Sequence, residues 1–148
     1  MVAFEIETLI PHRPPFLWLD QILSLNDTII VAEKFFSADF SLYHGHYPNY
    51  PITPGVILCE AVFQAGAALI AYRLQQEQRS SNGLPVLTRI YNAKFKRQVP
   101  PDSLVVLEAK LVEIVGPSWI MKGKVKLGGK TAVSVEFGCA EVVLQPPE

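Results

Sequence analysis

The longest apolar stretch of the chain runs from Gly55 to Tyr72, where Glu60 and Gln64 are the strongly polar residues. A segment of this length that is apolar on all sides is typical of a helix buried in the core of a domain. The spacing of four residues places Glu60 and Gln64 on one face of that helix. The pattern therefore predicts one long core helix that carries a carboxylate and an amide.

The limits of this helix follow from the residues that flank it. Thr53 is expected to cap the free amides, Pro54 suits the first turn, and a polar stretch predicts an end near Gln78.

About 20 apolar residues could also cross a bilayer, but Glu60 and Gln64 near the middle would be costly in lipid. We expect no membrane span.

Shorter segments on either side of the helix are rich in β-branched and aromatic residues, which favour strands. The turn signal Asn26-Asp27 predicts a hairpin of Phe16 to Leu23 with Thr28 to Phe36, and residues 37 to 53 are expected to form an ordered loop. Beyond a loop over Ser80 to Gly83, strands are expected over Pro85 to Val99, Ser103 to Val115, Ser118 to Leu127 and Thr131 to Leu144, the last two joined by a Gly128-Gly129 turn.

One buried helix with about six mostly antiparallel strands predicts a single α+β domain over residues 1–148, in which a curved sheet wraps the helix. The formal net charge of −1 provides no general attraction for nucleic acid. Two cysteines are too few for a disulfide scaffold, and Cys59 is interpreted as a core residue. The first ten residues lack the pattern of a secretory signal, so we expect a cytoplasmic protein.

Candidate chemistry centres on His46 and Glu60, which lie on either side of the Pro54-Gly55 step. A carboxylate buried without a partner would have a pKa above its usual value near 4.3, so Glu60 requires a reason to be there. A His and a Glu that meet in an apolar pocket are a plausible proton-transfer pair.

Four motifs in this order resemble those of the bacterial 3-hydroxyacyl-acyl carrier protein dehydratases of FabZ type. They are His12 to Asp20, Gly45-His46-Tyr47-Pro48, Pro54 to Ala61 and Lys94 to Pro100, and the spacing from His46 to Glu60 also matches. The resemblance implies a hotdog fold and a homodimer, often a trimer of dimers. It also implies active sites at the dimer interface, each with the His of one subunit and the Glu of the other.

The resemblance also implies roles for single residues. His46 would take the C2 proton of a 3-hydroxyacyl thioester, and Glu60 would assist departure of the C3 hydroxyl. The backbone N–H of Gly55, at a helix N-terminus, is the expected contact for the thioester oxygen. Gln64 is expected to orient the carboxylate or a water, and Pro54 and Tyr50 to lie near the substrate.

The acidic acyl carrier protein requires a basic surface. Candidates are Lys94, Lys96 and Arg97, or else Lys122, Lys124 and Lys126 on one face of a later strand, and a solvated strand face remains the alternative for both groups.

Four residues beside the catalytic motifs depart from the family pattern. Asn49-Tyr50 follows Pro48 where Gly-Asp is usual, His44 replaces Gln, and Thr53 replaces a common Met. These departures concern substrate choice more than the type of reaction, and Glu60 in place of Asp favours dehydration without isomerisation.

Two other functions and one other site remain open. A hotdog thioesterase, or a non-catalytic module that binds acyl groups or the carrier, would explain the same fold. A metal site built on His44 and His46 with His12 or Asp39 would need further ligands that the sequence does not supply, so we expect neither a metal nor a cofactor.

Overall fold

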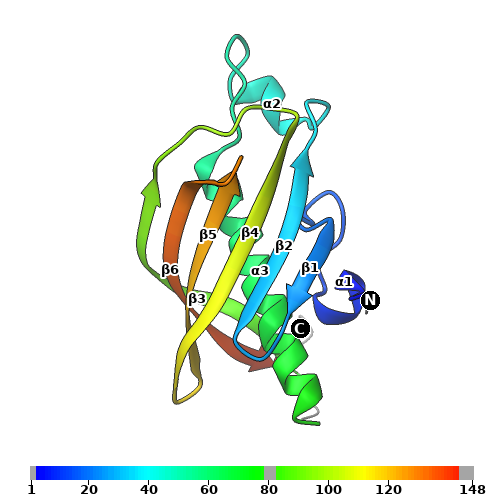
Figure 1. Cartoon of the computed structure of the whole chain (residues 1–148), viewed down its shortest axis with the longest axis vertical. Coiled ribbons are helices and arrows are strands. Elements are labelled where there is room, and N and C mark those ends of the chain that lie inside the picture. The colour runs from blue at the N-terminus through cyan, green and yellow to red at the C-terminus, as the bar shows by residue number, and fades with distance from the viewer. Residues whose placement is uncertain (1–2, 79–82, 144–148) are drawn as a thin grey trace, which may run out of the picture.

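The computed structural model describes residues 3–78 and 83–143. A long helix, α3 (Gly55–Gln76), packs on one face of a curved antiparallel sheet, as Figure 1 shows. The described residues form six strands in the order β1-β2-β4-β5-β6-β3. Their limits are β1 Gln21–Leu25, β2 Ile29–Phe36, β3 Gly83–Phe95, β4 Ser103–Val115, β5 Ser118–Leu127 and β6 Lys130–Val143, and two short helices are α1 Ile6–Leu9 and α2 Leu42–Gly45.

The predicted core helix is confirmed, and burial accounts for its apolar composition. Most side chains of α3 from Leu58 to Ile70 are buried against the sheet. By length and composition α3 could span a membrane, yet most of that window is covered by the rest of the domain. Gly123 of β5 lets helix and sheet approach closely, because a Cβ there would lie 2.2 Å from a methyl carbon of Val62. The chain therefore has the α+β architecture that its pattern predicts.

Most strand predictions are confirmed. β4 and β5 have the predicted limits, and β6 begins one residue earlier than expected. Gly128 and Gly129 both have positive φ, as a tight turn between paired strands requires. The predicted loop over Ser80 to Gly83 lies largely outside the described residues, as does Leu144, while Gly83 itself begins β3.

Three local predictions are wrong in part. Residues 16–20 are not strand: the backbone N–H of Trp18 donates to the Gln64 side chain, whose amide donates to the Phe16 carbonyl, so this segment is anchored on α3 instead of the sheet. The region from 37 to 53 contains α2 as well as loop. Thr53 does not cap α3, because Pro54 occupies that position and the Thr53 hydroxyl shares a 2.6 Å hydrogen bond with the Tyr43 hydroxyl.

The end of β3 also differs from the prediction. The strand stops at Phe95 rather than Val99, although the backbone N–H groups of Lys96 and Arg97 still donate to the carbonyl of Ala132 in β6. The backbone N–H of Thr53 donates to the Val99 carbonyl at 2.8 Å. The segment after β3 therefore holds the loop that leads into α3.

Candidate active site

His46 follows α2 and is fixed by the loop that leads to α3. Its ring Nδ1 lies 2.9 Å from the carbonyl oxygen of Ile52, and the backbone N–H of Ile52 donates to the His46 carbonyl at 3.0 Å. A carbonyl can only accept, so Nδ1 carries the proton and Nε2 of the neutral ring carries the free lone pair. The loop thus presents His46 as a base through Nε2.

The N-terminus of α3 lies beside this imidazole. His46, Pro54 and Gly55 line one hollow of about 380 Å³, here called the His46 hollow, together with Phe95 and Arg97 from the end of β3. The amides of Gly55 and Val56 start the helix and have no acceptor within it. Gly55 is required for packing as well, since a Cβ there would lie 2.6 Å from the Phe95 ring. The hollow combines a base with helix-terminal donors.

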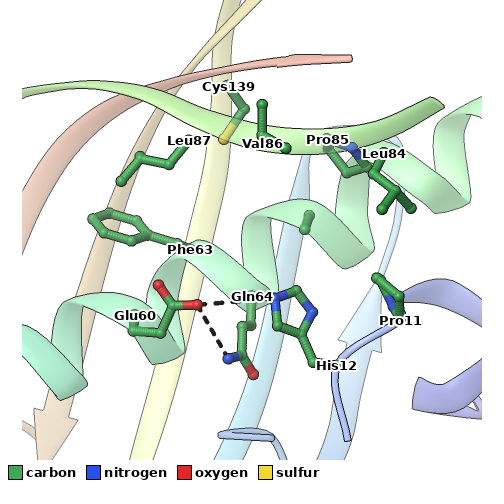
Figure 2. Close-up of a pocket in the computed structure, with 11 residues that line it drawn as sticks. Pro11, His12, Glu60, Phe63, Gln64, Leu84, Pro85, Val86, Leu87 and Cys139 are labelled. Carbon is green, nitrogen blue, oxygen red and sulfur yellow. Dashed lines mark hydrogen bonds and ion pairs between the residues drawn. The ribbon is translucent and has the colours of Figure 1, made fainter. Parts of the chain in front are cut away.

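Glu60 lies in a second hollow of about 240 Å³, here called the Glu60 hollow and shown in Figure 2. Its side chain is about a quarter exposed (26%), and Oε1 accepts a hydrogen bond of 3.2 Å from Nε2 of Gln64. Glu60 is therefore neither fully buried nor without a hydrogen-bond donor, and Gln64 is the donor. The hollow lies between one face of α3 (Glu60, Phe63, Gln64, Ala67) and residues of the sheet (Leu84, Pro85, Val86, Leu87, Cys139), with Pro11 and His12 at its side.

Gln64 holds the carboxylate in a fixed network. Its amide donates to Glu60 and to the Phe16 carbonyl, and its oxygen accepts from the backbone N–H of Trp18 at 2.8 Å. Gln64 is almost fully buried, so each of these bonds matters to the fold. The position of Glu60 is thereby linked to the segment that precedes β1.

His12 completes the polar side of the Glu60 hollow. Its Nε2 lies 3.9 Å from Oε1 of Glu60, and burial lowers its pKa, an effect that the Glu60 charge opposes and the Arg13 charge reinforces. The ring is therefore neutral at pH 7. Cys139 lies across the hollow, and burial, with a further contribution from the Glu60 charge, raises its pKa to about 12. The thiol stays protonated, so it acts as apolar lining.

Comparison with known proteins fits this arrangement. The family model described as a FabA-like domain matches residues 10–136. The 3-hydroxyacyl-[acyl-carrier-protein] dehydratase FabZ of Xanthomonas euvesicatoria is 33% identical over 138 residues, which cover 92% of this chain and 90% of that protein. The chain belongs to the FabZ-type dehydratase family.

Solved structures show the hotdog fold that this family predicts. The dehydratase heterocomplex ApeI:P from Xenorhabdus doucetiae superposes with a TM-score of 0.77 at 14% identity, covering 96% of this chain and 92% of that chain. A hypothetical thioesterase with coenzyme A from Streptococcus pneumoniae gives 0.62 at 12% identity, covering 85% and 88%. Because dehydratase and thioesterase share the fold, function has to be argued from residues.

The two residues that the FabZ-type motifs single out are not brought together within one copy of the chain. His46 and Glu60 line separate hollows, the first near the C-terminal end of β3 and the second near its N-terminal end. Pro54 and Gly55 lie with His46, and Gln64 lies with Glu60. Each hollow thus holds part of the chemistry expected of a FabZ-type dehydratase.

The remaining expected site residues lie elsewhere. Tyr50 is 61% exposed and its hydroxyl donates to Oε1 of Gln98, and it lines neither hollow. Lys94 and Lys96 lie on the outer face of the sheet, whereas Arg97 lines the His46 hollow. In the described part of the chain, no three His, Cys, Asp or Glu side chains are grouped to hold a metal ion.

Sequence reasoning missed three residues of the Glu60 hollow. In the sequence His12 stands out only as part of a motif and as a possible metal ligand, and Phe63 and Cys139 do not stand out. The position of Phe63, three residues after Glu60, was a usable signal because side chains at that spacing share a helix face. His12 and Cys139 approach Glu60 through long-range folding, which no local pattern reveals.

Proposed function

We propose that the chain removes water from 3-hydroxyacyl thioesters carried by acyl carrier protein and forms trans-2-enoyl thioesters, in fatty-acid or related lipid biosynthesis in the cytoplasm. Membership of the FabZ-type family supports this reaction. The observation that carries it is the His46 hollow, where an imidazole that makes its hydrogen bond through Nδ1 and has no described partner at Nε2 lies beside the start of α3. A base and oriented donors are what removal of a weakly acidic C2 proton requires.

In the proposed reaction Nε2 of His46 takes the C2 proton. The negative charge that develops on the thioester oxygen is stabilised by the backbone N–H of Gly55, at the positive end of the helix dipole. The C2–H electron pair then forms the double bond to C3, and the C3–O bond breaks. The leaving hydroxide takes up the proton that His46 removed from C2, directly or through a water, and departs as water, which returns His46 to its starting form.

Glu60 provides the second part of this chemistry. Its carboxyl group contacts the C3 hydroxyl, directly or through a water, and assists departure of the oxygen. Gln64 donates to Oε1 of Glu60, which leaves Oε2 without a hydrogen bond to any described residue. Gln64 is therefore a positioning residue in this proposal, not a catalytic one.

A homodimer would unite the two halves of the site. Among the described strands β3 is an edge strand, and Ile90 and Tyr91 are exposed along it. An exposed apolar edge favours pairing with another strand. Tyr91 lies midway along the chain between the two hollows. Leu84–Leu87 contribute to the Glu60 hollow on one side of it, and residues 95–98 reach the His46 hollow at the same separation on the other side. Antiparallel pairing of β3 with its copy around Tyr91 would therefore set the Glu60 hollow against the partner's His46 hollow.

The reverse reaction provides a direct test. The purified chain is incubated with trans-2-enoyl thioesters of several lengths on acyl carrier protein, and loss of enoyl absorbance is followed while mass spectrometry detects addition of water. We expect hydration, with His46→Ala and Glu60→Ala each reducing turnover about 10²-fold or more. Release of free thiol without a hydroxyacyl product would instead indicate a thioesterase. Tight carrier binding without turnover would indicate a binding module.

A further inference from the structure

The outer face of the sheet carries a concentration of lysines that the net charge of −1 conceals. Across the sheet Lys94 of β3 pairs in register with Ser134 of β6, which pairs with Lys124 of β5. Lys122 and Lys96 flank this row, and the four lysines line a shallow hollow of about 260 Å³ around Ser134 and Glu136. We call Lys94, Lys96, Lys122 and Lys124 the lysine face.

The positive charge of this face is largely uncompensated. Lys122 has Glu136 at 3.6 Å, whereas Lys94, Lys96 and Lys124 have no ion pair with any residue that the structure describes. The nearby Lys126 is paired with Glu108 at 3.0 Å and does not line the hollow. Three of the four lysines on this face therefore carry positive charge that no described acidic group neutralises, so the face can attract an anionic partner.

The lysine face adjoins the His46 hollow around the end of β3. Lys94 and Lys96 point outward, and Phe95 between them points to the other side, where its ring lies against Gly55. The next residue, Arg97, lines the His46 hollow. A partner bound to the lysine face would thus be separated from His46 only by the end of β3.

We propose that the lysine face is the docking surface for the acidic carrier protein, with Lys94 and Lys96 at the end of β3 and Lys122 and Lys124 of β5 acting together across β6. This inference rests on the proposed function. The two basic strips that the sequence presents as alternatives form one surface, because β6 brings them side by side. The phosphate-bearing arm of the carrier passes around the end of β3, where Arg97 contacts it on the way to His46.

The size of the surface favours a small acidic protein over other anionic partners. The lysines lie on β5 and at the end of β3, on either side of β6, around a single hollow. Acidic residues on one helix of a carrier could contact several of these lysines at once. Charge complementarity of this kind mainly accelerates association and is weakened by salt.

The test compares one acyl group on two carriers. Rates of hydration are measured for a 2-enoyl group on acyl carrier protein and on N-acetylcysteamine, with wild type, with Lys94→Glu/Lys124→Glu and with Lys130→Glu. Lys130 is an exposed lysine at the start of β6 and does not line the hollow. We expect the double variant to raise KM for the carrier substrate about tenfold or more and to lose most of its salt dependence. Its rate on N-acetylcysteamine substrate should match wild type, and Lys130→Glu should change either KM by less than about threefold.

Each result bears on one proposal. Activity of wild type on the N-acetylcysteamine substrate tests the dehydratase itself. An unchanged carrier KM in the double variant, or an equal loss on both substrates, overturns the docking surface. Vesicles of phosphatidylglycerol provide a second comparison. If wild type binds them, the double variant does not, and the carrier KM is the same for both, the face belongs to a membrane contact and the proposal is overturned.

Discussion

At the scale of single residues, Gln64 links the fold to the candidate chemistry. It is buried and makes hydrogen bonds to Glu60, to the Phe16 carbonyl and to the Trp18 amide. We predict that Gln64→Leu leaves the buried Trp18 amide and the Phe16 carbonyl without their partner and lowers the free energy of unfolding by about 1–3 kcal/mol. Because Glu60 also loses its donor, kcat should fall more than KM changes. Urea unfolding and steady-state kinetics check both, and an unaltered kcat in a destabilised variant would reject the positioning role.

His12 should make stability depend on pH. Burial lowers its pKa in the folded state below the usual value near 6.5, so the unfolded chain binds a proton more readily. Stability from the neutral ring is present above pH 6.5 and is lost as the pH falls through the lowered pKa. We expect His12→Asn to lose less stability than wild type between pH 7.5 and pH 5. Thermal unfolding across this range measures the difference, and parallel curves for the two proteins would contradict it.

Phe63 should restrict the acyl group beside Glu60. Its ring faces the Glu60 hollow (Figure 2). It also packs on the buried ring of Phe137 with centroids 4.8 Å apart, so it cannot easily turn away. We predict that Phe63→Ala widens the hollow and lowers the free energy of unfolding by about 3–5 kcal/mol. The value of kcat/KM for longer or branched acyl groups, divided by the value for short ones, should rise about tenfold. Phe63→Leu should give a smaller shift. A substrate profile that is unchanged in both variants would exclude this role.

At the scale of elements, the contact of α3 with β5 depends on Gly123. An added Cβ would lie 2.2 Å from a methyl carbon of Val62 and 2.8 Å from the Glu108 carbonyl oxygen. Relieving the second contact would require a shift of the β4 backbone, which is energetically costly. We predict that Gly123→Ala lowers the free energy of unfolding by about 1–3 kcal/mol. Gly45→Ala is the matched control, since nothing lies within 4 Å of its added Cβ. Chemical denaturation of both variants is the measurement, and equal stabilities would show that helix and sheet can separate without cost.

The elements also show which features the sequence could predict. α3, β4 and β5 follow directly from local patterns of burial, and the Gly128-Gly129 turn follows from backbone conformation. Residues 16–20 have the composition of a strand, but Gln64, far along the chain, binds their backbone. The Thr53 hydroxyl similarly bonds Tyr43 rather than the helix. Local patterns therefore predict the elements, whereas contacts between distant segments decide their ends.

The same distinction applies to the candidate site. His46, Gly55 and Glu60 stand out in the sequence through motif and spacing. His12 and Glu60 are 48 positions apart in the sequence (60 minus 12). They approach each other only when the segment before β1 folds over α3. The separation of His46 from Glu60 into two hollows likewise depends on how β3 crosses the helix.

At the scale of the whole molecule, the open edge of β3 connects assembly to function. Each copy carries one hollow with the base and another with the carboxylate. If the site is shared, a dimer of His46→Ala with Glu60→Ala contains one site with both residues intact and one with neither. A site within one copy would instead be inactive in every such dimer.

We therefore predict recovery of activity when these two inactive variants are unfolded and refolded together. With random pairing, half of the dimers are mixed and each has one intact site, so about a quarter of wild-type activity should return. The control mixes Glu60→Ala with the double variant His46→Ala/Glu60→Ala, because those mixed dimers contain no intact site and should stay inactive. Activity is measured with an enoyl thioester, and mixed dimers are verified by distinct affinity tags. Verified mixed dimers without recovery would place His46 and Glu60 in one subunit's site and reject pairing through β3 as the origin of the active site.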